Sequence, residues 1–438
     1  MTAPVALDLS RLALAPVRRV PRGIDRVELA YARYFLNDWP GDCLPILPTP
    51  WGVRCHERRW GLAFLSAVEA LWRESVEPSQ DPSLAAVKSF LAGHEPASST
   101  GARRLRMTSL EQARGFLKLL SAAGLPLGRS VTRTLPEGSF YLNAGQLQVF
   151  RPSMTWLCRR PDVQSVFMIY DLIPLEWPEH HIDTDIRLHH AIMRNTAEFA
   201  KALIVPSETV RLSVRRELSK YPKHDLPIHV ELLPVAPRFL QAAAEDYELR
   251  NSAYFVVCSA IDAYKNHLLL LEVWTKLVAI HGGNAPKLVV AGTPGVTADA
   301  VIGYYRNNPA IRGHVIMTSG LSTPALQGLM ANARALLMPS LAEGFGLPVI
   351  EALSQGTQVV ASDISAHREA GAGGDVIYLN PTDKEQWRAC IEALAASPRR
   401  RSSGVKYRPK TWLDYFAGIR SFLSSVTEAR GGAARIAG

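Results

Sequence analysis

Residues 333–356 constrain the fold of this chain more than any other stretch. The stretch opens with an apolar run that reads as a buried strand, and Gly344 and Gly346 follow in a loop that can approach a ligand closely. Pro348 suits the first turn of a helix, where no amide hydrogen is needed, and Gly356 is placed to end that helix. Free amides and the helix dipole both favour a phosphate group at such a helix start. The stretch therefore predicts an α/β unit with an anion site.

Two carboxylates accompany this predicted site, Glu343 in the loop and Glu351 in the first helical turn. Carboxylates beside a bound diphosphate hold hydroxyl groups rather than phosphate, which indicates a sugar nucleotide. The plain alternative for Glu351 is that it only complements the helix dipole. The string EGFGLPVIEA over 343–352 resembles the glutamate-x7-glutamate signature of family 4 retaining glycosyltransferases. The string GIDRV over 23–27 resembles the glycine-isoleucine-x-arginine-valine segment of the polysaccharide-assembly type of that family. This resemblance implies the GT-B fold, in which two Rossmann-like domains face a central cleft.

Strand and helix patterns alternate in two series along the chain, which independently predicts an α/β protein with two doubly wound domains. We expect an N-terminal acceptor-side domain over 1–240, with a helical insertion around 51–135 beside the acceptor side. A C-terminal nucleotide-sugar-binding domain is expected over 250–408. The resemblance implies that a C-terminal helix over 409–427 packs back on the first domain. The remaining tail, 428–438, is rich in Gly, Ala and Arg and is predicted to be disordered.

The resemblance assigns catalytic roles to Lys265, Asp171 and Glu343. Lys265 stands just before a predicted helix and can reinforce a phosphate site as a point charge, although it could also be a solvated helix-start residue. Asp171 follows a predicted strand, and polar residues at the C-terminal end of a parallel strand project into the ligand crevice. The preceding residue, Tyr170, stands where relatives usually have histidine, so no role of an imidazole is carried over.

The residues expected to bind the donor lie in glycine-rich loops or beside helix starts, and they are Gly23, Lys265, Gly292, Gly344, Phe345, Gly346, Leu347 and Glu351. Preorganised amides, a lysine and helix dipoles can stabilise a leaving diphosphate without a metal. The resemblance gives Glu351 the ribose hydroxyls and Glu343 the hydroxyls of the transferred sugar. It also implies retention of anomeric configuration, with the departing phosphate taking the acceptor proton. The two glutamates are therefore not interpreted as a glycosidase-like nucleophile and acid.

Histidines and aspartates gather over 179–190, and this cluster invites a metal interpretation. Within it, Asp183, Thr184 and Asp185 resemble the DxD metal motif of another glycosyltransferase fold. They precede a predicted helix, however, where Asp183 or Thr184 would cap free amides. We therefore predict no metal site and no cofactor, and a nucleotide-diphosphate sugar as donor substrate.

The charge of the chain bears on its partners. The formal net charge is +9, and basic residues cluster at several places, notably at Arg18, Arg19 and Arg22. No nucleic-acid module motif is present, so we expect no nucleic-acid partner. An anionic membrane surface or a diphosphate-bearing acceptor fits the clusters, and a solvated surface is the alternative for each one. The five cysteines are scattered and no apolar run is long enough to span a membrane, which predicts a cytoplasmic protein. The resemblance, together with the basic clusters, implies that it is peripheral on the inner membrane face.

These observations predict a retaining, metal-independent hexosyltransferase of bacterial-type polysaccharide biosynthesis. Its acceptor would be a glycan or a lipid-diphosphate-linked saccharide. Two alternatives stay open, namely a sugar-nucleotide epimerase and a non-catalytic GT-B protein that binds a nucleotide or a partner enzyme. Tyr170, and the absence of the arginine that many relatives carry near Lys265, keep the non-catalytic alternative open.

Overall fold

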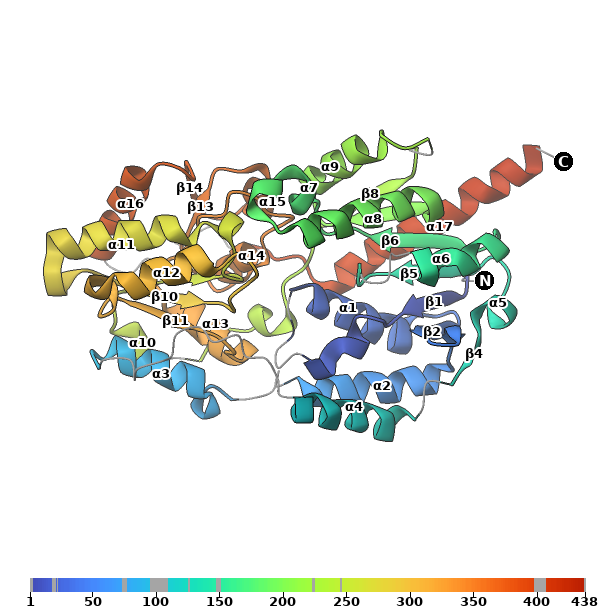
Figure 1. Cartoon of the computed structure of the whole chain (residues 1–438), viewed down its shortest axis with the longest axis horizontal. Coiled ribbons are helices and arrows are strands. Elements are labelled where there is room, and N and C mark those ends of the chain that lie inside the picture. Colours follow the sequence, from blue (N-terminus) through green and yellow to red (C-terminus); the bar gives the residue numbers. More distant parts are fainter. Residues whose placement is uncertain are drawn as a thin grey trace.

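The structure is a computed structural model that describes residues 3–17, 21, 23–72, 77–94, 109–124, 127–146, 151–222, 225–244, 246–397 and 407–436, without the side chains of 151–152 and 429–436. Two α/β halves lie side by side in it, as Figure 1 shows. The basic residues Arg18, Arg19 and Arg22 lie outside the described residues.

The first half is built on an 8-stranded sheet with the order β4-β3-β2-β1-β5-β6-β7-β8. Its strands are β1 (Val5–Asp8), β2 (Cys43–Thr49), β3 (Gly52–Cys55), β4 (Arg129–Ser130), β5 (Phe140–Asn143), β6 (Gln164–Met168), β7 (Ala202–Val205) and β8 (Ile228–Val230). From β2 to β8 along this order the neighbours run parallel, while β3 and β4 extend the sheet antiparallel. Strands β1, β5, β6 and β7 are buried along their whole length, as expected for a parallel sheet covered on both faces.

The second half holds a 6-stranded sheet with the order β11-β10-β9-β12-β13-β14. Its strands are β9 (Tyr254–Cys258), β10 (Lys287–Ala291), β11 (Val315–Thr318), β12 (Leu336–Met338), β13 (Val359–Ser362) and β14 (Val376–Leu379), and each paired neighbour is parallel. The predicted α/β class with two doubly wound sheets is therefore confirmed.

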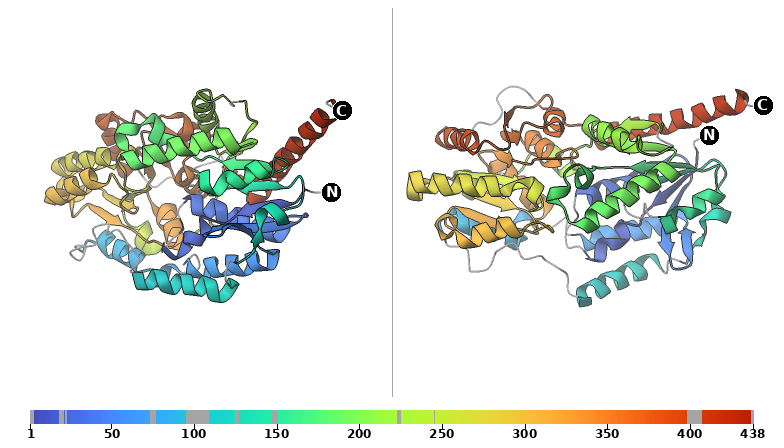
Figure 2. Two further views of the ribbon diagram at one scale, coloured as in Figure 1. Left: turned by 45° about the vertical axis from the view of Figure 1, so that its right-hand side comes forward. Right: turned by 45° about the horizontal axis from the view of Figure 1, so that its top comes forward.

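Helices cover both sheets (Figure 2). Those of the first half are α1 (Gly23–Arg33), α2 (Arg58–Leu71), α4 (Ser109–Ala123), α5 (Val131–Thr134), α6 (Arg151–Met154), α7 (Ile173–Glu176), α8 (Asp183–Phe199) and α9 (Glu208–Leu218), together with the 3-10 helix η1 (Leu12–Val17). Those of the second half are α10 (Tyr247–Arg250), α11 (His267–His281), α12 (Asp299–Asn307), α13 (Thr323–Asn332), α14 (Leu347–Ser354), α15 (Ser365–Ala370) and α16 (Lys384–Ala396).

One helix of the predicted insertion belongs to the other half of the molecule. Helix α3 (Pro82–Leu91) packs against β11, whereas α2 and α4, its neighbours in sequence, lie under the first sheet (Figure 1). Asp81 accepts hydrogen bonds from the amides of Ser83 and Leu84 at the start of α3, and its other oxygen accepts one from Ser322 N at 2.7 Å. Within the predicted insertion of 51–135, α3 is therefore bound to the second half, while the place of the acceptor stays a prediction.

The last helix runs back to the first half. Helix α17 (Trp412–Ile436) begins near the second half and continues past the first sheet (Figure 1). The hydroxyls of Tyr415 and Tyr31 lie 2.8 Å apart, and the ring of Phe416 stacks on Tyr34, directly after α1, with centroids at 4.1 Å. Since α17 extends to Ile436, the backbone of 428–436 is helical where a disordered tail was predicted. Of this tail, residues 437–438 lie outside the described residues. Among the helices described, none combines the length and the apolar character that crossing a membrane requires.

Candidate active site

The stretch that dominates the sequence folds as a strand, a loop and a helix. Strand β12 is buried, and α14 begins at Leu347 with Pro348 in its first turn. Gly346 precedes the helix with a φ of 104°, a left-handed conformation that favours glycine. At the other end Gly356 also has a positive φ, of 67°, and its amide donates to Leu353 O. The strand, the loop and the helix thus follow one another as the sequence predicts, and the α14 N-terminus lies beside the glycine loop.

The glycine loop is pressed against the first half of the molecule. A Cβ added at Gly344 would lie 2.2 Å from Tyr170 O and 3.1 Å from Asp171 Cβ, so only glycine fits at this approach. Gly344 O accepts a hydrogen bond of 2.7 Å from Ser207 Oγ. Because Asp171 and Ser207 follow β6 and β7, the carboxyl ends of the first sheet form one wall beside this loop. The structure therefore brings Asp171 next to the predicted donor loop.

Lys265 and Glu343 form a buried ion pair. Lys265 Nζ lies 2.6 Å from Glu343 Oε1, and the two side chains are 12% and 9% exposed. Burial by itself raises the pKa of Glu343, but the Lys265 charge and hydrogen bonds from Lys265 and Ser340 outweigh it and lower this pKa. Burial likewise lowers the pKa of Lys265, and the Glu343 charge outweighs it, so the pKa is raised. Lys265 is thus a charged, buried group and not the solvated helix-start residue of the alternative interpretation.

Backbone geometry places this lysine. The next residue, Asn266, has a φ of 57° and precedes α11. Its Nδ2 donates to Pro339 O at 3.1 Å and to Pro381 O at 2.9 Å. These bonds tie the start of α11 to the end of β12. Lys265 Nζ lies 4.8 Å from the centroid of the Tyr264 ring, which adds a cation–π contact.

The starts of α1 and α14 meet across the two halves. A Cβ at Gly23, the first residue of α1, would lie 3.3 Å from Leu347 Cδ1. Two helix N-termini therefore lie next to each other, and each favours negative charge. This geometry brings Gly23 together with the predicted donor residues of 344–347.

Glu351 has a partner that the sequence did not reveal. Its side chain is 5% exposed, and Arg26 Nη1 from α1 lies 3.3 Å from its Oε1. Burial raises the pKa of Glu351, and the charge of Arg26 offsets part of this effect. The sequence places Arg26 in the first turn after Gly23, within the segment that resembles the polysaccharide-assembly type, but gives no sign that its partner is Glu351. Glu351 is therefore more than a solvated complement to the helix dipole.

Gly292 lies in a different set of contacts. A Cβ at this position would lie 1.9 Å from Ser259 O, in the loop that follows β9. The amide of Gly292 donates to Thr318 O at 2.8 Å. These contacts explain why glycine is needed between the loops after β9 and β10, while its role in donor binding stays a prediction.

Two aromatic side chains lie near the position where relatives usually have a histidine, namely Tyr170 at that position and His181. The Tyr170 side chain is buried, and its hydroxyl donates to Ala144 O at 2.6 Å. This hydroxyl is therefore hydrogen-bonded within the first half and does not point to the glycine loop. The His181 ring stacks on Tyr264 across the two halves, with centroids at 5.1 Å. Burial lowers the pKa of His181, and its Nε2 is buried without a hydrogen-bond partner. The sequence placed His181 in a polar cluster and did not predict its contact with Tyr264.

The polar cluster over 179–190 does not gather around one point. Helix α8 begins at Asp183 with Ile182 as its N-cap and no side-chain cap, so the predicted capping by Asp183 or Thr184 is wrong. His189 Nδ1 lies 2.9 Å from Asp185 O within the same helix. Within the described ranges, no group of three or more His, Cys, Asp or Glu side chains is arranged to hold a metal ion.

If the reaction uses only amides, lysine and helix dipoles, activity should survive a chelator. We expect equal initial rates of nucleoside diphosphate release before and after dialysis against EDTA. Rates measured with and without added magnesium or manganese check this. Loss on chelation, with recovery on adding a divalent ion, would contradict the metal-independent account.

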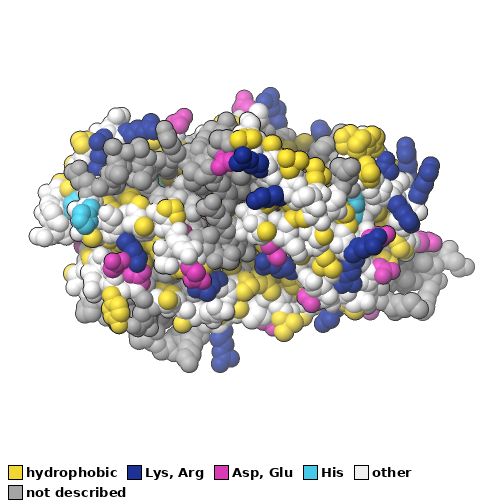
Figure 3. Space-filling model, turned by 90° about the horizontal axis from the view of Figure 1, so that it is seen from below, with side chains coloured by type: hydrophobic (Ala, Val, Ile, Leu, Met, Phe, Trp, Pro, Cys, Tyr) yellow, Lys and Arg dark blue, Asp and Glu magenta, His cyan; other side chains and the backbone are white. Residues whose placement is uncertain are grey.

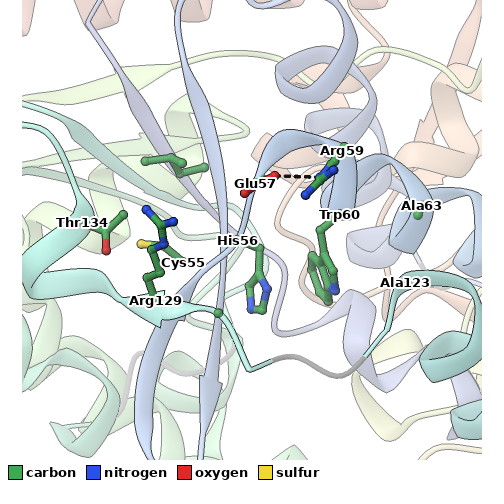
Figure 4. Close-up of a pocket in the computed structure, with 11 residues that line it drawn as sticks. Cys55, His56, Glu57, Arg59, Trp60, Ala63, Ala123, Arg129 and Thr134 are labelled. Atoms are coloured by element: carbon green, nitrogen blue, oxygen red, sulfur yellow. Dashed lines mark ion pairs between the residues drawn. The ribbon is translucent and has the colours of Figure 1, made fainter.

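Two cavities lie away from these residues, in the first half of the molecule. The larger, of about 620 Å³, is lined among others by His56, Trp60 and Arg129 (Figure 4). Burial lowers the pKa of His56 to about 4, so this imidazole is neutral at neutral pH. The Trp60 ring is already stacked against His56, at 4.0 Å, and Phe64, at 5.2 Å. A smaller, largely apolar cavity of about 310 Å³ shares Trp60 as a lining residue. Neither cavity is lined by a predicted site residue. The candidate active site is therefore the region between the two halves.

Residues 252–397 match the family described as "Glycosyl transferases group 1". The chain is 24% identical over 225 residues to O-antigen chain mannosyltransferase B of Escherichia coli, which covers 50% of this chain and 58% of that protein. It is 35% identical over 88 residues to O-antigen chain mannosyltransferase RfbU of Salmonella typhimurium, or 20% of this chain and 25% of that one. The matches thus span well under two thirds of these relatives.

Solved structures share the arrangement over most of the chain. A trehalose-6-phosphate synthase aligns with a TM-score of 0.56 at 12% identity, covering 98% of this chain and 99% of that one. Anabaena HepE, solved with UDP-glucose, aligns with a TM-score of 0.53 at 15% identity, covering 71% and 89%. At such identities the likeness shows the fold alone. The chain therefore has the GT-B fold, and its residues 252–397 are similar to the group 1 glycosyl transferases.

Proposed function

We propose that this chain is a retaining glycosyltransferase that moves a sugar from a nucleotide-diphosphate sugar to a saccharide acceptor. One observation carries the proposal: Glu343, in the loop before α14, forms a buried ion pair with Lys265, which precedes α11, and the start of α14 meets the start of α1. Free amides at both helix starts, together with a buried cation, suit a leaving group whose negative charge grows during the reaction.

Each residue of the site has a role in this proposal. Lys265 and the amides of 344–347 stabilise the departing diphosphate, and the raised pKa of Lys265 keeps it charged at neutral pH. Glu343 holds hydroxyls of the transferred sugar, and Glu351 holds the ribose. Asp171 lies on the opposite wall, beside the place where the acceptor would enter. The acceptor hydroxyl attacks from the leaving-group side, so its proton passes to the departing phosphate and no carboxylate nucleophile is needed.

The relatives suggest a substrate class. Proteins named as O-antigen chain mannosyltransferases match this chain, although each match covers only part of them. A further match is named MMP alpha-(1->4)-mannosyltransferase, from Mycolicibacterium hassiacum, at 42% identity over 84 residues. These matches cover 19% to 50% of this chain. Mannose is therefore the first sugar to test, in the assembly of a bacterial-type polysaccharide on a glycan or a lipid-diphosphate saccharide.

A donor screen tests the proposal. Uridine- and guanosine-diphosphate sugars, including the mannose donor, are titrated by calorimetry and then incubated with saccharide acceptors. We expect one donor to bind and to release its nucleoside diphosphate with formation of a longer saccharide. Failure of every donor to bind would overturn the proposal.

The same screen separates the alternatives. A non-catalytic protein would bind a nucleotide without releasing product, and the buried Tyr170 hydroxyl is the observation that favours this outcome. A sugar-nucleotide epimerase would change the sugar in the absence of any acceptor. Product analysis with and without acceptor therefore assigns one of the three activities.

We also propose that the protein binds an anionic membrane surface at the face that carries α4. Three large apolar side chains on this helix are well exposed, namely Leu110 at 61%, Phe116 at 40% and Leu117 at 64%. Arg114 and Lys118 lie on the same helix. Figure 1 places α4 at the bottom of the molecule, and Figure 3 shows that this face carries apolar side chains among basic and acidic ones. Apolar burial and charge together support interfacial binding.

The vesicle experiment follows from these residues. The protein should sediment with anionic but not neutral vesicles at low salt and be released at high salt, since each nearby basic residue contributes about 1 kcal/mol. Replacing Arg18, Arg19 and Arg22 together with Ser should weaken sedimentation, and so should Leu117→Ser. Leu212→Ser is the matched control, because this leucine is 53% exposed on α9. Equal partitioning to both vesicle types would contradict the proposal.

A further inference from the structure

The described charges around the start of α14 are nearly balanced before any ligand arrives. Lys265 is the cation that the second half places there, and its charge is already neutralised by Glu343 at 2.6 Å. Glu351 adds a further carboxylate in the second turn of α14, where the sequence predicted it in the first. A diphosphate bound at the free amides would thus meet an unshielded negative group. A further cation is needed to hold the diphosphate beside Glu351.

Arg26 is placed to be that cation. It belongs to α1 in the first half, yet its Nη1 lies 3.3 Å from Glu351 Oε1 and its Nη2 lies 3.5 Å from Thr323 Oγ1. Its side chain is 19% exposed. The charge of Arg26 also acts on the thiol of Cys258, which lies at the end of β9 in the second half. Burial raises the pKa of that thiol to about 12, with Glu351 adding to the effect and Arg26 opposing it.

The guanidinium is incompletely used in this arrangement. It offers five N–H donors, and its printed contacts are the two long ones just described. Its Nε is buried and has no hydrogen-bond partner. An arginine held near a helix start with free donors is suited to bind phosphate oxygens, which accept in the same fork geometry as a carboxylate.

The neighbouring backbone supports the same ligand. Gly23 lies one helical turn before Arg26 and meets Leu347 at the start of α14. A diphosphate bound between the two helix starts would therefore lie next to the first turn of α1, which carries Arg26.

We propose that Arg26 binds the donor diphosphate from the domain opposite the nucleotide-binding one, and shields it from Glu351. This rests on the proposed function, because it assumes that the α14 loop takes the diphosphate. In this arrangement donor binding requires both halves at once, since one cation comes from each.

Calorimetry with nucleoside diphosphates tests the assignment. Arg26→Gln should weaken binding of uridine or guanosine diphosphate by roughly 10- to 100-fold, the range for a lost hydrogen bond to a charged group. Arg26→Lys should weaken it less, because a point charge replaces the fork. Arg33→Gln is the matched control, since Arg33 lies on the same helix and pairs with Glu69 at 2.6 Å. The affinity for the bare nucleosides should stay nearly unchanged in all variants.

Two results would overturn the assignment. Equal or tighter diphosphate binding by Arg26→Gln would mean that Arg26 only closes the empty site. Equal weakening for nucleoside and diphosphate would mean that it only positions Glu351. Thermal melting identifies a misfolded variant, and in that case Arg26→Lys, which keeps the charge, decides between the outcomes. If the unaltered protein binds no nucleoside diphosphate, the proposed function fails instead, so the two failures are distinguishable.

Discussion

Replacing Lys265 with methionine is expected to lower turnover by roughly 10²- to 10³-fold, the usual loss when one preorganised charge stabiliser is removed. The reason is that Lys265 is a buried cation of the second half, paired with Glu343 in the loop that leads into α14. Methionine keeps the length of the side chain and removes the charge. Initial rates at saturating donor measure the effect.

This variant should also be less stable, which requires a control. Removing Lys265 leaves Glu343 buried without its ion-pair partner, and breaking a buried pair costs about 3–5 kcal/mol. The double variant Lys265→Met/Glu343→Gln has no unpaired charge and should regain much of the melting temperature without regaining turnover. Normal specific activity of the single variant, with a large melting shift, would make Lys265 a structural residue.

Gly344→Ala is expected to reduce kcat/KM by about 100-fold while each domain stays folded. The added methyl would lie 2.2 Å from Tyr170 O, which is backbone and cannot move aside as a flexible side chain would. The contact joins the two halves, so the molecule relieves the clash by moving them apart. Displacements of about 1 Å at an active site can cost about 10²-fold in rate.

Small-angle scattering and kinetics on the same preparations check this prediction. The radius of gyration of Gly344→Ala should exceed that of the unaltered protein. Gly328→Ala is the matched control, because Gly328 lies within α13 and a Cβ there meets nothing within 4 Å. It should be slightly more stable, since alanine favours a helix over glycine by about 1 kcal/mol. Unchanged rates for Gly344→Ala would show that the closed contact is not needed for the reaction.

The sequence predicts the buried parallel strands well. Runs such as 163–169, 202–207 and 254–259 enclose β6, β7 and β9, because a strand buried on both faces reads as continuous apolar sequence. Strand β2 escapes this signal, since Pro45 and Pro48 lie inside it and proline argues against a strand.

The place of α3 could not be predicted for a different reason. Helical periodicity shows that 82–91 can form a helix with one apolar face, but not which sheet that face meets. The choice is made by contacts between distant positions, such as Asp81 Oδ2 with Ser322 N and Ser83 Oγ with Ser319 O. Such pairs leave no periodic pattern in one sequence.

The residues of the candidate site also differ in whether local sequence or distant contacts determine their place. Residues of one local motif, such as Gly344, Gly346 and Pro348, were predictable because turn and helix-start chemistry is local. Arg26 was not, because its partner Glu351 lies 325 positions away on the other half. The stacking of His181 on Tyr264 is a second contact of this kind. Groups that complete the site across the two halves are therefore the ones that sequence reasoning missed.

The central claim is that the α14 loop and its lysine carry a retaining sugar transfer. Proton NMR of the anomeric signals, followed during turnover of the donor found in the screen, tests this most directly. If the transfer retains configuration, a sugar that is α-linked in the donor will be α-linked in the product. We expect no product from Lys265→Met. A β-linked product from that donor, or a bound donor whose anomeric signal never changes, would contradict it.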